Sequence, residues 1–364
     1  MLRHTTLLAA ALTASLCNHT PVPQSRVEMV GTMHVGRAAH TVTSLPGGQI
    51  LIAGGMPAGG NATPSFEIFD SRRNAIVRSG DMLESRAGHT ATALPDGRVV
   101  IAGGYNGLYL ATVELFDPRT GHFTSAGRMT VGRSGHTATF LRDGTILFTG
   151  GNGDGYTFLA SAETYDPRTG RAQSVGSLGV ARESHTATPM RDGRVLIAGG
   201  HRGRHEAIVI YRQAEIYDPT TRRFTATGAM NVARHKHDAV GLSDGRVLIL
   251  GGSDNRDSRG RYTSTEIFDP SHGTFMLGVA MRSPRFKFRD TTVSLSNGGI
   301  LVAGGARNAE LLGSGAPAFR NVPGDFGSDL SFAASTPLAD GGALIAGGYD
   351  EHGRKSAGVW RFYR

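Results

Sequence analysis

The sequence has little that could crosslink the chain or anchor it in a membrane. It contains a single cysteine and a single tryptophan in 364 residues, so no internal disulfide can form. After the N-terminal stretch, no segment reaches the roughly 18 apolar residues of a membrane-spanning helix. A nucleophile elbow, a phosphate-binding loop and a zinc-protease motif are also missing. We therefore expect no disulfide scaffold, no transmembrane span, no catalytic residues and no cofactor.

Residues 1–17 have the features of an export signal. Arg3 and His4 precede an apolar run over residues 7–16, which has the length of a signal-peptide core. Residues 14–17 resemble a lipoprotein box, although Leu16 stands where that motif has a small residue. Ordinary cleavage and lipid attachment at Cys17 both stay open. Either route predicts a secreted, periplasmic or outer-envelope protein of a bacterium, with residues 18–364 as one mature domain.

Positive charge is in excess, and most of it is arginine. The formal net charge is +8 and the isoelectric point is about 10.0, which favours anionic partners. No run of consecutive basic residues with interleaved aromatics occurs, so we do not expect nucleic-acid binding.

Glycine is abundant and regularly placed. The chain has 52 glycines, about twice the usual share of roughly 7%. Seven Gly-Gly pairs each end a short apolar run, with 43 to 53 residues between successive pairs. The pairs begin at Gly54, Gly103, Gly150, Gly199, Gly251, Gly304 and Gly347. Such runs, as in residues 50–53 and 99–102, are typical of strands buried on both faces.

Each repeat contains signals for three further strands. A strand such as residues 89–92 lies upstream, joined to the apolar run by a tight Asp-Gly turn. A third strand, such as residues 113–116, ends in Asp-Pro-x-x-Gly, and a fourth strand follows. Four antiparallel strands in a repeat of this length predict one propeller blade. The sequence thus predicts an all-β fold, a seven-bladed propeller.

The two ends of the chain predict how the ring closes. Residues 25–30 align with a fourth strand before the first repeat has begun, and the chain stops after the third strand at residues 358–362. We therefore expect the N-terminal strand to complete the last blade, which removes open sheet edges.

The repeats resemble the kelch family, whose hallmarks are the double glycine, an aromatic residue before Asp-Pro, and an Arg-x-x-His motif. The resemblance covers approximately residues 26–364. It implies a β-propeller, in agreement with the strand pattern.

The Arg-x-x-His motif and a third-strand glutamate favour structural roles. A ring of zinc ligands is excluded, because equivalent positions of a propeller are too far apart for one ion. We expect the histidines to form hydrogen bonds inside each blade and the arginines to pair with the glutamates, with an anion site in the axial channel as the alternative for the arginines.

Counting back from the sixth Gly-Gly assigns Lys287 to the basic position of that blade, with Glu310 as its partner; the seventh blade has Leu330 and Gly358 instead. The repeated residues are Arg37, His40, Arg86, His89, Arg133, His136, Arg182, His185, Arg234 and His237, with Glu67, Glu114, Glu163, Glu215 and Glu266.

Residues that depart from the repeat are the better candidates for a binding site. The longest loops between second and third strands, in blades four and five, are rich in arginine, which suits carboxylate, phosphate or sulfate. The alternative is that these loops are solvated surface. Two Asp- and Asn-rich loops lack the spacing of a calcium loop, so we expect no metal site. The candidate ligand-binding residues are Arg202, Arg204, His205, His235, Lys236, Arg256, Arg259 and Arg261.

We expect a monomeric, non-catalytic binding module for a protein, glycan or other anionic ligand outside the cytoplasm. Kelch-like copper-radical oxidases need a tyrosine crosslinked to cysteine. Because the sole cysteine, Cys17, lies in the export signal, we do not expect this activity. The alternative function is a carbohydrate-active enzyme that resembles the kelch-type sialic-acid mutarotases, although that family has six blades.

Overall fold

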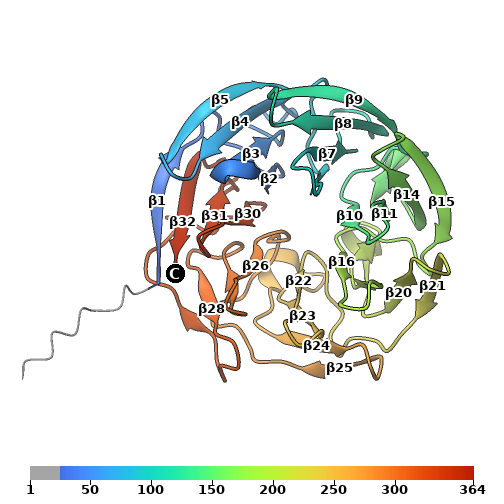
Figure 1. Ribbon diagram of the computed structural model, residues 1–364. Helices are drawn as coiled ribbons and strands as arrows, with labels where there is room; N and C mark the ends of the chain where they lie inside the picture. The colour runs from blue at the N-terminus through green and yellow to red at the C-terminus, as the bar shows by residue number, and fades with distance from the viewer. Residues whose placement is uncertain (1–24) are drawn as a thin grey trace, which may run out of the picture.

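The structure is a computed structural model that describes residues 25–364. It contains seven four-stranded antiparallel sheets, which Figure 1 shows as blades around a central axis. This arrangement confirms the predicted all-β, seven-bladed propeller. The export signal and Cys17 lie outside the described residues. Within residues 25–364, no helix has the length and apolar character needed to cross a membrane.

In each of the first four blades, the strands follow one another in chain order from the axis outward. Blade 1 consists of β2 (Thr41–Ser44), β3 (Gln49–Ala53), β4 (Ser65–Asp70) and β5 (Ala75–Asp81). Blade 2 consists of β6 (Thr90–Ala93), β7 (Val99–Ala102), β8 (Thr112–Asp117) and β9 (His122–Arg128). Blade 3 consists of β10 (Thr137–Phe140), β11 (Ile146–Thr149), β14 (Ser161–Asp166) and β15 (Arg171–Ser177). Blade 4 consists of β16 (Thr186–Pro189), β17 (Val195–Ala198), β20 (Ala214–Asp218) and β21 (Arg223–Ala226).

The remaining blades and the loop elements complete the ring. Blade 5 consists of β22 (Asp238–Gly241), β23 (Val247–Leu250), β24 (Thr265–Asp269) and β25 (Thr274–Leu277). Blade 6 consists of β26 (Thr292–Ser294), β27 (Ile300–Val302), β28 (Glu310–Leu312) and β29 (Arg320–Asn321). Blade 7 consists of β30 (Ala334–Pro337), β31 (Ala343–Ala346), β32 (Gly358–Tyr363) and β1 (Arg26–Thr32). The loop ribbons are β12 (Asn152–Gly153) with β13 (Thr157–Phe158) and β18 (His201–Arg202) with β19 (Val209–Ile210); the 3-10 turns are η1 (Pro46–Gly48), η2 (Asp154–Tyr156), η3 (His205–Ala207) and η4 (Asp257–Arg259).

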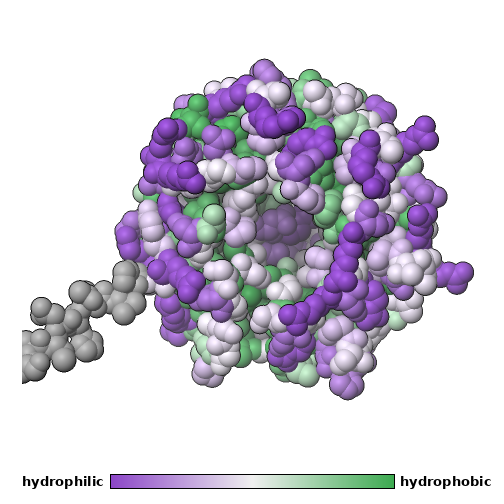
Figure 2. Space-filling model, in the orientation of Figure 1, coloured by the Kyte–Doolittle hydropathy of each residue, from purple (hydrophilic) through white to green (hydrophobic). Residues whose placement is uncertain are grey.

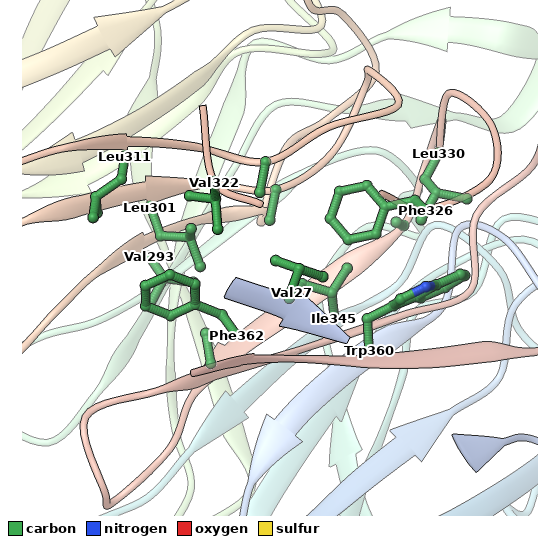
Figure 3. Close-up of a cluster of buried hydrophobic side chains, with 14 of the residues drawn as sticks. Val27, Val293, Leu301, Leu311, Val322, Phe326, Leu330, Ile345, Trp360 and Phe362 are labelled. Carbon is green, nitrogen blue, oxygen red and sulfur yellow. The ribbon is translucent and has the colours of Figure 1, made fainter. Parts of the chain in front are cut away.

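The N-terminal strand β1 closes the ring, as predicted. It pairs antiparallel with β32, with Val27 opposite Phe362 and Met29 opposite Trp360. Val27 is buried together with residues of blades 6 and 7, including Phe326, as Figure 3 shows. First and last segments of the chain therefore share one sheet, and the apolar core between the blades continues through the closure.

The double glycine of one blade receives the Arg-x-x-His motif of the next. Gly54 has φ +61°, and a Cβ there would lie 2.5 Å from the carbonyl oxygen of Arg86 and 2.7 Å from Cε1 of His89. Any larger residue would therefore clash with the neighbouring blade as well as adopt a strained backbone. Equivalent contacts join Gly103 to His136 and Gly150 to His185. The two motifs recur together because they form one interblade contact.

Four of the five motif histidines bond between blades and not inside a blade, so that part of the prediction was wrong, and the ring nitrogens of His40 have no hydrogen-bond partner among the described residues. Nε2 of His89 lies 3.1 Å from Oγ1 of Thr41 on the preceding blade. Matching contacts join His136 to Thr90, His185 to Thr137 and His237 to Thr186. A pairing across blades is not visible in the sequence of a single repeat.

Six arginines form buried ion pairs with the third-strand glutamates of their own blades. The Nη2–Oε1 distance is 2.8 Å between Arg133 and Glu163. The second carboxylate oxygen of Glu163 accepts the backbone N–H of Thr130, from the segment that enters the blade. The other pairs are Arg37–Glu67, Arg86–Glu114, Arg182–Glu215, Arg234–Glu266 and Arg285–Glu310. These guanidinium groups are used inside the blades and do not line the axial channel as an anion site.

The assignment of Lys287 to the ion-pairing position was wrong. Arg285 pairs with Glu310 at 3.1 Å. Its bond to the carbonyl of the Gly-Gly pair spans 19 residues, where the same bond spans 17 in blade 3. Blade 6 therefore carries a two-residue insertion, and counting back from its Gly-Gly misplaces the motif by two. Phe288 takes the place of the histidine and packs against Gly251.

Candidate functional site

A ring of seven equivalent residues surrounds the mouth of the axial channel. Each is the second residue between Arg and His of the motif, or its counterpart in blades 6 and 7, and each has φ between 52° and 65°. Six backbone N–H groups of the ring donate to the carbonyl of the equivalent residue in the preceding blade, including Lys287 to Lys236 at 2.9 Å and Ala39 to Phe332 at 3.1 Å. We call these residues the channel ring: Ala39, Gly88, Gly135, Ser184, Lys236, Lys287 and Phe332.

The composition of the channel ring changes from one side of the axis to the other. Blades 2 and 3 have glycine, the residue that adopts this left-handed backbone without strain. Blades 5 and 6 have Lys236 and Lys287, for which the same backbone costs about 1 kcal/mol or more each. The chain has only three lysines among its 38 basic residues. Their place in the ring thus concentrates two of the three ammonium groups at one point of the channel mouth.

The channel ring lines a cavity of about 360 Å³ that opens among the loops between second and third strands. This volume lies within the range of roughly 300–1,000 Å³ usual for small-molecule sites. Figure 2, in the orientation of Figure 1, shows that the axis of the ring is also hollow and hydrophilic on the side that faces the viewer. Besides the ring, the cavity is lined by residues that include Tyr105, Tyr109, Tyr156, Glu183, Arg204, Arg289 and Asp290.

Three tyrosines form an aromatic wall over blades 2 and 3. The ring centroids of Tyr105 and Tyr109 are 5.0 Å apart, and those of Tyr109 and Tyr156 are 6.1 Å apart. The guanidinium of Arg204 lies 4.6 Å from the centroid of Tyr156, which is a cation–π contact. The wall therefore offers flat apolar area with hydroxyl groups at its edges.

The insertion in blade 6 places Arg289 across the channel. Its Nη1 donates to the carbonyl of His136 in blade 3 at 3.1 Å, and its Nε lies 3.4 Å from the carboxylate of Asp290. Both residues also line a second cavity of about 470 Å³ on the other side, among the threonines of the inner strands. Arg289 thus forms the floor of the mouth cavity and brings a further cation to it.

Asp238 holds the backbone of this insertion. It replaces the threonine that would bond the next histidine, and its Oδ2 accepts the backbone N–H groups of Thr291 and Thr292 at 3.1 and 2.9 Å. Burial, with a smaller contribution from Asp290, raises the pKa of Asp238 to about 6. The changes at Asp238 and Phe288 together adapt this one interblade contact to the two extra residues.

Acidic groups balance part of the positive charge of the mouth cavity. The carboxylate of Glu183 accepts a hydrogen bond from Asn152, and burial raises its pKa although Asn152 and Arg204 oppose the shift. Asp257, on η4, bonds Lys236 at 2.8 Å and lies 3.8 Å from Lys287.

The structure brings only two of the eight candidate residues to this cavity. Arg204 and Lys236 line it. His235 is buried, with Nδ1 3.1 Å from Nδ1 of His201, and burial together with the charge of Lys236 lowers its pKa to about 4. Arg261 pairs with Asp329 at 2.8 Å. Arg202, His205, Arg256 and Arg259 are exposed on the loops and do not line the cavity.

Sequence reasoning missed Lys287, Arg289, Glu183 and the tyrosine wall. Two signals could have found part of the site. The longer spacing between Arg285 and Gly304 marks the insertion that carries Arg289, and Lys236 and Lys287 occupy the same place in their motifs once Arg285 is aligned. The tyrosines have no equivalent signal, because they come from loops of different length.

The residues of the mouth cavity do not fit a copper-radical centre. The sole cysteine is Cys17, and the two histidines that line the cavity, His40 and His89, are buried. Within the described residues, the one group of potential metal ligands is Asp350, Glu351 and His352, which lies apart from this cavity.

The comparisons with known proteins agree with the fold. Residues 85–130 match the kelch motif. A search of curated proteins finds no match. Among solved structures, a fungal alcohol oxidase of the AA5 family in complex with copper is similar, with a TM-score of 0.71 and 16% identity over 92% of this chain and 75% of that chain. Taken with the seven four-stranded blades, the matching motif supports membership of the kelch-repeat β-propellers.

Proposed function

We propose that this propeller is a non-catalytic binding module that recognises an anionic ligand in its mouth cavity, outside the cytoplasm. The observation that carries the proposal is the placement of Lys236 and Lys287 in the channel ring. Glycine would occupy both positions with less strain, so the lysines are best explained by their side chains. Arg204 and Arg289 add two cations to the same cavity.

The proposed location outside the cytoplasm is inferred from the sequence of residues 1–17. The anionic class of the ligand rests on the four cations, which exceed the two carboxylates, Glu183 and Asp290, that line the cavity with them. The tyrosine wall supports a ligand with a flat ring or sugar face next to its charged group.

An array of acidic and neutral glycans and small anions tests the proposal. We compare the mature protein with Lys236→Gln/Lys287→Gln and with Arg256→Gln/Arg259→Gln, which removes the same charge from the exposed loop of blade 5. Binding of an anionic compound should disappear in the lysine variant and persist in the arginine variant. Loss of binding in the arginine variant alone would place the site on the outer loop. Binding that is unchanged in both variants would contradict the proposal.

A second candidate function is acid–base chemistry on a sugar in the same cavity. Glu183 and Asp290 both line it, and the raised pKa of Glu183 suits a proton donor. Exchange between sugar anomers, followed by NMR with and without the protein, tests this function. Acceleration that Glu183→Gln abolishes would support an enzyme; rates equal to the uncatalysed exchange would support the binding module.

A further inference from the structure

The two ring lysines share one carboxylate of the chain itself. Lys236 Nζ lies 2.8 Å from Oδ1 of Asp257, and Lys287 Nζ lies 3.8 Å from Oδ2. Lys287 Nζ also donates to the hydroxyl of Tyr349 at 3.1 Å. The two ammonium groups are thus spaced so that the two oxygens of a single carboxylate face one each.

Asp257 belongs to an exposed turn and not to a blade. It begins η4, has φ 54°, and its side chain is 44% exposed. Its backbone bonds stay within the turn, from its own N–H to Asp254 and from Gly260 to its carbonyl. Burial opposes ionisation, but the hydrogen bond and charge of Lys236 and the charge of Lys287 hold the pKa of Asp257 below its usual range. A part-exposed ion pair of this kind contributes little to stability, so another carboxylate can replace it at low cost.

The lysine pair and the tyrosine wall lie on opposite sides of a narrow cavity. The lysines come from blades 5 and 6, and the tyrosines come from the loops of blades 2 and 3. Arg289 shows how short the distance across is, because one side chain from blade 6 reaches the backbone of blade 3. A ligand with one ring can therefore contact the tyrosines while its charged group contacts the lysines.

We infer that the mouth cavity binds a sugar carboxylate, a uronic-acid residue, whose carboxylate replaces that of Asp257 between Lys236 and Lys287. This inference rests on the proposed binding function and specifies its ligand class. The sugar ring packs its C–H face on Tyr105 and Tyr109, and its hydroxyls reach Glu183 and Arg289. Asp257 acts as an internal competitor, so the lysine pair is never left without a counter-ion when the ligand is absent.

Calorimetric titration with trigalacturonate tests the inference, with neutral galactotriose and a sulfated galactose as comparison ligands. Asp257→Asn should bind trigalacturonate about three- to fivefold more tightly than the wild type, because a part-exposed ion pair no longer competes. Lys236→Gln and Lys287→Gln should each weaken binding about tenfold or more, because each removes a charge-assisted bond. Asp244→Asn makes the same charge change in the turn between β22 and β23, away from the cavity, and should bind like the wild type.

The outcomes separate this inference from the function beneath it. Unchanged or weaker binding by Asp257→Asn would overturn the competitor role. Lysine-dependent binding of the sulfated sugar but not of trigalacturonate would overturn the carboxylate class and leave an anion-binding module. Failure of all three sugars to bind, with anions of the array binding independently of both lysines, would overturn the proposed function itself. Melting temperatures of the variants equal to that of the wild type show that each variant is folded.

Discussion

The guanidinium of Arg289 reaches across the axis of the propeller and donates a hydrogen bond to the main-chain oxygen of His136, 3.1 Å away. This contact joins blade 6 to blade 3 and separates the cavity among the loops from the cavity among the inner strands.

Arg289→Met keeps the aliphatic stem of the side chain and removes this bond. Because the arginine is part-exposed and bonds one carbonyl, we expect the free energy of unfolding to fall by only about 1–2 kcal/mol. Chemical denaturation measures this change. Arg282→Met, at an exposed position outside the channel, should leave stability unchanged. A loss as large as that of a buried ion pair would mean that the axial contact supports the whole ring.

Arg133 and Glu163 provide the corresponding test for a buried pair. Arg133→Met leaves the glutamate buried without its counter-ion, so unfolding free energy should fall by about 3–5 kcal/mol. Arg133→Met/Glu163→Gln should recover part of this loss, because the amide oxygen still accepts the N–H of Thr130 and no charge stays buried. Arg246→Met, in an exposed pair with Asp244, should change stability little. A double variant no more stable than Arg133→Met would show that the charge of Glu163 is not the source of the loss.

The blades were predictable because their signals are local. The Gly-Gly pairs, the apolar strands before them and the Asp-Gly and Asp-Pro turns each act within a few residues. The pairs and their strands occur seven times, Asp-Gly turns occur in five repeats and Asp-Pro turns in four. The N-terminal strand followed from the same pattern, since residues 25–30 match an outer strand that the last repeat lacks. The arginine–glutamate pairs were predicted from their joint absence in blade 7, where Leu330 is buried in the apolar core.

The site was less predictable because its residues meet through the closed ring. Lys236 and Arg256 are close in sequence, yet Lys236 lies at the axis and Arg256 is exposed and pairs with Asp254. Position along a loop does not say whether a side chain points toward the axis or outward. The bonds from His89 to Thr41 and from Arg289 to His136 likewise join different blades, so no single repeat contains them.

The buried histidines make the propeller sensitive to acid. Burial, then the charge of Arg37, lowers the pKa of His40 to about 3, and burial holds the pKa values of His89, His136, His185 and His237 well below their usual value. The unfolded chain takes up these protons near pH 6.5, whereas the folded chain does not. The stability that neutral histidines contribute is therefore complete above pH 6.5 and is lost as the pH falls below it.

Protonation of Asp238 has the opposite effect on stability. Its pKa of about 6 in the folded protein means that the folded state takes up a proton before the unfolded state does, which adds stability as the pH falls from about 6 to 4. One such group offsets one histidine. His201 and His235, whose pKa values burial lowers to about 3 and about 4, act in the same direction as the other five histidines. We therefore expect the unfolding free energy to fall by roughly 8 kcal/mol per pH unit around pH 5.5, at about 1.4 kcal/mol per unit for each net proton. Urea titrations at several pH values measure this slope.

His185→Gln should reduce the slope by about 1.4 kcal/mol per pH unit, the contribution of one proton. His122→Gln, at an exposed position of β9, should leave the slope unchanged. Equal slopes in the two variants would mean that His185 is not the neutral, buried group that its contacts with Thr137 and Thr149 indicate.

Closure of the ring by β1 can be tested with two residues of that strand. Val27 is 3% exposed and packs in the core between blades 6 and 7, whereas Met29 is 58% exposed on the same strand. Val27→Asp should lower the unfolding free energy by about 3 kcal/mol or more, because it buries an unpaired charge, and Met29→Asp should have little effect. A chain that begins at Met33 should melt well below one that begins at Ser25, since without β1 the edge of β32 is open and Trp360 and Phe362 lose part of their cover. Equal melting temperatures for the two truncated chains, or for the two aspartate variants, would show that another contact closes the ring.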